Sequence, residues 1–157
     1  MFKLENIIRK NIINLTPYSS AREEFKEEAS ILLDANENPF ETALNRYPDP
    51  FQTALKKELS IIKRVATNQI FIGNGSDEAI DLLFRAFCEP GKDKSYVFPP
   101  TYGMYEVSAN INNIETVKIS LNSDFQLPNI NKLLGRIDSN GLLFICSPNN
   151  PTGNIYP

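Results

Sequence analysis

Short apolar segments alternate with amphipathic helical stripes along residues 69–147, and this alternation limits the possible folds more than any other feature of the sequence. We predict strands at Gln69–Ile72, Ser95–Phe98, Glu115–Ile119 and Leu142–Ser147. We predict intervening helices at about Ser76–Cys88, after a cap at Thr101, and at 129–136. Strands that alternate with helices favour an α/β layered domain with a largely parallel sheet. The last strand is apolar over Leu142–Cys146, as expected of a strand buried on both faces.

The first 45 residues follow a different pattern. One helical face is formed by Leu4, Ile8, Ile12 and Leu15. Pro17 ends that helix, and an acidic stretch and the turn-rich segment 34–39 follow. We predict an arm over residues 1–45 that lies against something other than its own small core. The regular pattern then begins with a helix that Asp49 caps and Pro50 starts.

The charge balance excludes some classes of partner. With 16 basic and 19 acidic residues the net charge is −3, which argues against broad electrostatic binding of nucleic acid or anionic membranes. No apolar run approaches the roughly 20 residues of a membrane-spanning helix. The first 15 residues mix charges with apolar residues and lack the pattern of a signal peptide. We therefore expect a cytoplasmic protein.

Histidine is absent from the sequence, and the only cysteines are Cys88 and Cys146. This composition excludes Ser-His-Asp and Cys-His catalysis and the commonest zinc sites, and we predict no metal site. Two distant cysteines in apolar runs do not form a disulfide framework, so we expect buried, reduced thiols. Any catalysis would have to draw on other groups, and a cofactor is the natural candidate.

A glycine-containing segment, Gly73–Glu78, lies between a predicted strand and the start of a predicted helix. The N-terminus of a helix presents unpaired N–H groups and a partial positive charge, which suit a phosphate, and glycine lets the backbone approach an anion. Ser76 adds a hydroxyl group. A capped helix in which Asp77 and Glu78 only complement the helix dipole is an equally good interpretation. The segment is neither a Walker A loop nor a full GxGxxG motif.

Two further motifs follow predicted strands. Tyr102 comes just after the strand at 95–98, and ligands of parallel sheets bind outside the carboxyl ends of the strands. Its ring is suited to stacking on a flat heterocycle, although packing in the core is the alternative. Asn149 and Asn150 follow the apolar strand between two prolines, where they either form a turn or point into a cleft.

The chain resembles the fold-type-I pyridoxal-phosphate (PLP) aminotransferases in three motifs that occur in the same order, at residues 73–83, 99–105 and 147–153. It resembles the histidinol-phosphate aminotransferase branch in particular at residues 14–22, 34–39 and 44–50. The resemblance covers nearly the whole chain. It implies a three-layer αβα large domain, of which residues 46–157 are the first part, preceded by an arm (1–45) that contributes to the substrate site and the dimer.

The resemblance implies a cofactor-binding role for several residues. The backbone of Gly75, Ser76 and Asp77 would bind the PLP phosphate. Tyr102 would lie against the pyridine ring. Asn150 would donate a hydrogen bond to the phenolic oxygen of the cofactor and stabilise its anionic form.

Residues before the first predicted strand would complete the site. The resemblance implies that Tyr47 reaches across a homodimer interface to the PLP phosphate of the partner subunit. Tyr18 and Asn36 would belong to the substrate pocket. Phe40 and Glu41 depart from the family pattern, because many relatives have a small glycine-containing turn at these positions.

The implied reaction is reversible amino transfer between L-histidinol phosphate and 2-oxoglutarate, which gives imidazole acetol phosphate and glutamate in histidine biosynthesis. It needs a lysine that forms a Schiff base with PLP, and in relatives this lysine lies downstream of the 147–153 motif. The lysines in surface-like contexts that do not match this position include Lys92, Lys94, Lys118 and Lys132.

We therefore expect the 157 residues alone to be inactive. They would be either part of a transaminase or a non-catalytic remnant that binds phosphate or a partner chain. Aromatic amino acids and threonine phosphate are the alternative substrates within the same fold.

Overall fold

The computed structural model describes residues 3–19, 31, 33–137 and 140–156. The chain divides into two compact units. One unit combines Met1–Leu15 with Gly73–Pro157, and the other is Thr16–Ile72. Among the described residues, no helix is both long and apolar enough to cross a membrane.

The larger unit is built around a parallel sheet, which among the described residues has three short strands. They are β1 (Lys94–Val97), β2 (Glu115–Lys118) and β3 (Gly141–Leu143). The strand order is β2-β1-β3. Lys94 of the central strand β1 pairs with Glu115 of β2 on one side and with Gly141 of β3 on the other. Both pairings are parallel, which confirms the sheet type predicted from the alternation of elements.

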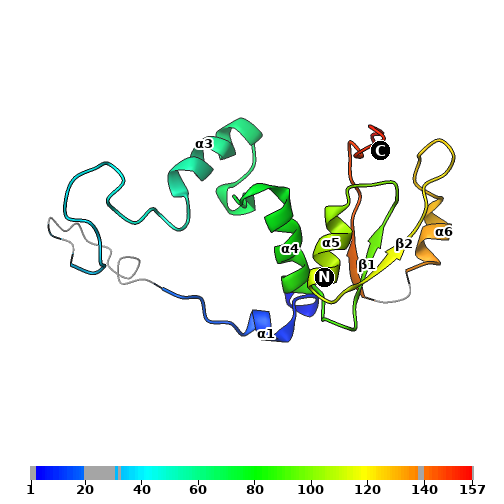
Figure 1. Cartoon of the computed structure of the whole chain (residues 1–157), viewed down its shortest axis with the longest axis horizontal. Helices are drawn as coiled ribbons and strands as arrows, with labels where there is room; N and C mark the ends of the chain where they lie inside the picture. Colours follow the sequence, from blue (N-terminus) through cyan, green and yellow to red (C-terminus); the bar gives the residue numbers. More distant parts are fainter. Residues whose placement is uncertain (1–2, 20–30, 32, 138–139, 157) are drawn as a thin grey trace. The chain divides into compact units, whose positions relative to one another are not determined.

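Helices cover both faces of this sheet and give the unit three layers (Figure 1). The helices are α4 (Gly75–Phe87), α5 (Met104–Ile111) and α6 (Ile130–Leu134). Phe84 of α4 and Tyr105 of α5 pack with Val97 on one face. Leu133 of α6 packs with Tyr96 on the opposite face. Successive side chains of a strand point to opposite faces, so β1 contributes to both halves of the core.

Asp81 ties α4 to the end of α5. Its carboxylate accepts hydrogen bonds from Arg85 Nε at 2.6 Å and from Asn112 Nδ2 at 2.7 Å. The Arg85 guanidinium and then the Asn112 amide hold the pKa of Asp81 below its usual value. The bond to Asn112 joins the two helices that carry residues of the candidate site, whereas the bond to Arg85 lies within α4.

The predicted continuous helix over Leu4–Leu15 is wrong. The structure has a 3₁₀ turn, η1 (Leu4–Asn6), and a short helix, α1 (Lys10–Ile13). Arg9 separates them with an extended backbone, and its N–H donates to the Ala86 carbonyl at 2.9 Å. The Arg9 side chain also bonds to α4 and its following turn. Contacts with the end of α4 therefore outweigh the local helical periodicity.

The smaller unit contains α3 (Thr53–Lys63) and the 3₁₀ turn η2 (Thr67–Gln69). The predicted helix start is wrong by three residues, because the N-cap residue is Gln52 and Pro50 lies outside the helix. The Asp49 carboxylate still accepts from the Thr53 N–H at 2.7 Å. The predicted strand at Gln69–Ile72 is not formed. Ile70 has an extended backbone, but a strand also needs a neighbour to pair with, and none of the described residues provides one.

The last predicted strand is shorter and less buried than its apolar sequence indicated. Pairing covers only Gly141–Leu143, and Ile145 is 47% exposed. Within the described part of the chain β3 has β1 as its sole neighbour, so one edge has no ladder partner. Burial on both faces, predicted for Leu142–Cys146, is therefore incomplete.

Candidate functional site

The carboxyl ends of β1 and β3 lead into the two loops that carry the predicted polar motifs. The chain leaves central β1 through α5 to β2 on one side and returns through α6 to β3 on the other. The direction of winding therefore reverses between β1 and β3. In open α/β sheets, ligands bind at such a switch point, outside the carboxyl ends of the strands.

The N-terminus of α4 lies beside the loop that follows the carboxyl end of β1. Gly75 has a φ of +77°, a left-handed conformation that favours glycine. Asn74, the N-cap residue, makes no side-chain capping bond to the first turn of α4. The Gly75 N–H donates to the Gly73 carbonyl at 3.0 Å. The amide groups that remain for an anion are therefore those of Ser76 and Asp77. The Glu78 carboxylate turns back to accept from the Asn74 backbone and side chain. The exposed Ser76 hydroxyl lies in the first turn, so the helix end offers an anion both N–H and O–H donors.

Tyr102 lies next to this helix end. Its hydroxyl donates to Asp77 Oδ1 at 2.9 Å, which joins the loop after β1 to the first turn of α4. This bond is the main cause that raises the pKa of Tyr102. The structure thus brings together two of the predicted cofactor-binding residues, although the bond uses the Asp77 side chain, whereas the sequence analysis considered its backbone.

A short chain of aromatic contacts supports the Tyr102 ring. Tyr102 meets Tyr105 edge to face, with ring centroids 5.7 Å apart. Tyr105 in turn stacks on Phe144, with centroids 4.6 Å apart. Burial, followed by contact with Cys146, raises the pKa of Tyr105 to about 12, so its hydroxyl stays neutral at physiological pH. The ring that is predicted to face a heterocycle therefore rests on a rigid aromatic base.

Asn149 connects the two loops. Its side chain is buried and accepts from Thr101 Oγ1 at 2.9 Å, while its Nδ2 donates to the Pro100 carbonyl at 2.9 Å and to Thr152 Oγ1 at 2.8 Å. The predicted capping role of Thr101 is wrong, because its hydroxyl bonds to Asn149 and α5 begins at Met104 after Gly103. The motif predicted that the Asn-Asn pair forms a turn or points into a cleft, and the structure shows that Asn149 is its buried member.

The remaining predicted residues are exposed. Asn150 follows Asn149 directly at the surface of the loop after β3. Tyr18, Asn36 and Tyr47 belong to the Thr16–Ile72 unit, where Tyr18 is 90% and Tyr47 is 65% exposed. The described contacts therefore unite Asp77, Tyr102 and the loop of Asn150, and the other three residues belong to the second unit.

The lysines considered in the sequence do not converge on this region. Lys118 ends β2, and its Nζ pairs with Glu106 Oε1 at 2.8 Å. Lys94 begins the central strand β1 and so lies at the amino end of the strand, away from the candidate site. Lys92 and Lys132 are exposed.

These features define an α/β protein with an open helix N-terminus and a braced aromatic ring at the switch point of a parallel sheet. The family model described as "Aminotransferase class I and II" matches residues 13–157. The chain belongs to this family.

Relatives agree with this assignment over almost the whole chain. The histidinol-phosphate aminotransferase of Bacteroides thetaiotaomicron is 56% identical over 156 residues, covering 98% of this chain and 45% of the relative. That of Christiangramia forsetii is 51% identical over 158 residues, covering 99% of this chain and 45% of the relative. The chain thus spans less than half the length of these relatives.

Solved structures share the fold. The histidinol-phosphate aminotransferase of Clostridium acetobutylicum matches 72% of this chain and 32% of that chain, with a TM-score of 0.59 and 26% identity. The Sinorhizobium meliloti enzyme, in complex with pyridoxal-5'-phosphate, matches 71% of this chain and 30% of that chain, with a TM-score of 0.59 and 21% identity. The predicted fold-type-I large-domain architecture is confirmed by these matches and by the parallel sheet.

Proposed function

We propose that the complete protein carrying this chain is a PLP-dependent transaminase. It transfers an amino group between L-histidinol phosphate and 2-oxoglutarate, a step of histidine biosynthesis. The observation that carries this proposal is the identity of 51–56% to histidinol-phosphate aminotransferases over 98–99% of the chain. The cytoplasm is the compartment we expect for this step.

The donor groups of the candidate site match the chemistry of PLP. The uncapped N-terminus of α4 and the Ser76 hydroxyl suit its phosphate. The Tyr102 ring suits the flat pyridine. The exposed Asn150 amide suits the phenolic oxygen. The phosphate, the ring and the phenolic oxygen of PLP therefore each have a chemically suitable group near the carboxyl ends of the strands.

When bound, PLP would supply the electron sink that amino transfer requires. The residues of this chain would bind and orient it. The α4 N-terminus would hold the phosphate through N–H groups of Ser76 and Asp77. Tyr102 would face one side of the ring in an orientation that its bond to Asp77 restricts.

The Asn149 network would hold the loop that presents Asn150. The Asn150 amide would donate to the phenolic oxygen and favour its anionic form, because a donor stabilises the charged acceptor.

The Thr16–Ile72 unit would supply the rest of the site. We propose that the complete protein is a homodimer in which Tyr47 donates to the PLP phosphate bound by the partner subunit. Tyr18 and Asn36 would contact substrate. Their exposure supports this proposal, since exposed side chains are free to meet a second subunit or a substrate.

A substrate comparison tests the proposal. The complete gene product, loaded with PLP, is assayed with 2-oxoglutarate and either L-histidinol phosphate, L-phenylalanine or O-phospho-L-threonine. We expect kcat/KM for L-histidinol phosphate to exceed that for the other two by at least about 100-fold. L-Phenylalanine leaves a phosphate-binding group of the site unpaired, and O-phospho-L-threonine lacks the imidazole ring and adds a carboxylate that L-histidinol phosphate does not have. Preference for either competitor, or no glutamate formation, would contradict the proposal.

A further inference from the structure

Glu37 is a buried carboxylate in a segment without helix or strand. It lies in the Thr16–Ile72 unit, in the loop from Asp34 to Tyr47, and its side chain is only 4% exposed. Its neighbours Asn36 and Asn38 are exposed. Burying a carboxylate is unfavourable unless hydrogen bonds and opposite charge compensate for the lost water. The residues around Glu37 therefore have to supply hydrogen-bond donors and a positive charge.

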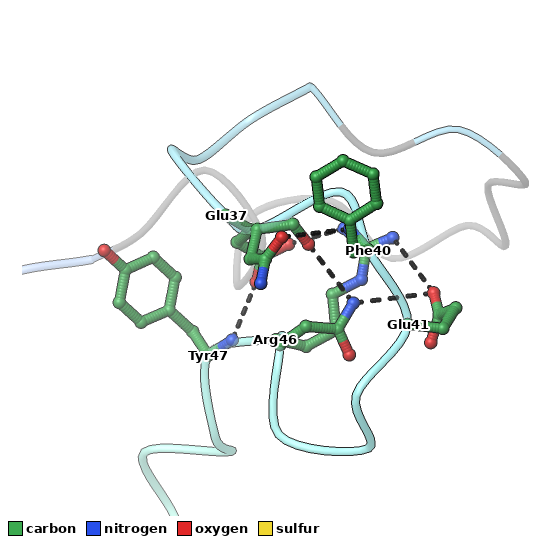
Figure 2. A network of polar contacts seen from close by, with 7 residues as sticks. Glu37, Phe40, Glu41, Arg46 and Tyr47 are labelled. Carbon is green, nitrogen blue, oxygen red and sulfur yellow. Dashed lines mark hydrogen bonds and ion pairs between the residues drawn. The ribbon is translucent and has the colours of Figure 1, made fainter.

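The Glu37 carboxylate joins the two ends of this loop, as Figure 2 shows. Oε1 accepts from the Tyr47 backbone N–H at 2.7 Å. Oε2 accepts from Arg46 Nη1 at 2.9 Å. Charge-assisted bonds of this kind are stronger than bonds between neutral groups. Glu37 thus fixes the backbone at the position from which the Tyr47 side chain leaves the loop.

The contacts that Asn45 and Glu41 make within the loop are longer. Asn45 Nδ2 donates to the Asn38 carbonyl at 3.2 Å and to Glu41 Oε1 at 3.5 Å. Arg46 Nη2 lies 3.8 Å from Glu41 Oε1, and the Glu41 side chain is 79% exposed. An exposed ion pair at this distance contributes little. Arg46 thus sits between two carboxylates, and the buried one, Glu37, makes the closer contact.

We propose that Glu37 is a positioning residue for Tyr47. It does not touch the cofactor, but its bond to the Tyr47 N–H sets the direction of that side chain, and Arg46 neutralises its charge. This inference rests on the proposed function, in which Tyr47 donates to the PLP phosphate in the partner subunit. A carboxylate near that phosphate would repel it, so the pairing with Arg46 has a second consequence, which is to remove this repulsion.

The test is a double-mutant cycle on PLP affinity. The variants E37Q, Y47F and E37Q/Y47F of the complete gene product are prepared as apo-proteins, and the dissociation constant for PLP is measured by absorbance titration. In E37Q an amide –NH₂ replaces one acceptor and faces a donor, so the loop loses a bond. Glu41→Gln is the matched control, because Glu41 meets the same Arg46 from an exposed position.

We expect Y47F to weaken PLP binding about tenfold or more, since a hydrogen bond to a charged group is lost. E37Q should weaken it roughly three- to tenfold, and E37Q/Y47F should bind within about twofold of Y47F alone, because both changes remove the same contact. E41Q should stay within about twofold of wild type.

Losses that simply multiply in E37Q/Y47F, or an effect of E37Q no larger than that of E41Q, would overturn the role of Glu37. Unchanged affinity in Y47F would overturn it as well. Wild-type transamination, assayed in parallel, reports on the proposed function independently of either result. If E37Q is not recovered as folded protein, R46A takes its place in the cycle, with the same non-additivity expected.

Discussion

A hydrogen bond between Tyr102 and Asp77 links two elements of the candidate site through single side chains. Each residue is identifiable from its sequence position, one after a strand and one at a helix start. The bond between them cannot be identified in the same way, because the two residues are 25 positions apart in the sequence. Asp77 therefore has two roles. Its backbone belongs to the first turn of α4, and its side chain orients the Tyr102 ring.

The bond leads to a prediction for Asp77→Asn. A carboxylate that accepts from a phenol stabilises the neutral phenol, so replacing it with a neutral amide should lower the pKa of Tyr102 toward its ordinary value of about 10. Ultraviolet titration of phenolate absorbance, with Y102F to assign the signal, measures the change. Glu78→Gln is the control, because Glu78 bonds to Asn74. Identical Tyr102 titrations in D77N and wild type would contradict the contact.

At the scale of elements, the two adjacent asparagines in the loop after β3 have different roles. Asn149 is buried and braces the loop after β1, whereas Asn150 is exposed. The predicted strand that precedes them was too long, and the continuous helix predicted at the N-terminus was wrong. In both cases the local apolar pattern was correct, but pairing and contacts with distant residues decided where regular structure ended.

This division predicts opposite phenotypes for the two asparagines in the complete protein. Asn149→Ala should lower the free energy of unfolding by about 2–3 kcal/mol, because it leaves buried loop groups without partners. Asn150→Ala should change it by less than about 0.5 kcal/mol. It should instead raise the pH midpoint of the absorbance change of bound PLP by about 1–2 units, since the anionic oxygen loses a donor.

Urea denaturation and spectral pH titration measure the two effects. Equal losses of stability in both variants would contradict the division. A spectral midpoint that does not move in N150A would remove the role proposed for that amide.

At the scale of the whole molecule, the 157-residue chain carries more apolar surface than its described sheet and helices cover. The strongly exposed apolar side chains include Ile61, Ile62, Phe71, Ile111 and Ile155. Within the described residues, β3 has an edge without a ladder partner. Unpaired edges and large apolar patches favour association with other chains.

We therefore predict that the 157-residue polypeptide, prepared by itself, is marginally folded, binds hydrophobic dyes and self-associates. Sedimentation velocity across a dilution series, amide hydrogen exchange and dye fluorescence measure these properties, with the complete gene product as control. A monodisperse monomer with strongly protected amides throughout residues 69–147 would contradict the prediction.

The sequence by itself determined the parallel α/β class, the helix after Gly75 and the positions of Tyr102 and the Asn-Asn pair after strands. These follow from apolar periodicity and turn residues, which act over a few residues. Only the tertiary structure decided that Asn149 is the buried member of the pair, that Thr101 bonds to it across 48 residues, and that the Glu37 side chain is only 4% exposed. Such choices depend on which distant donors and acceptors the fold brings together, because a buried polar group is stable only where it finds a partner.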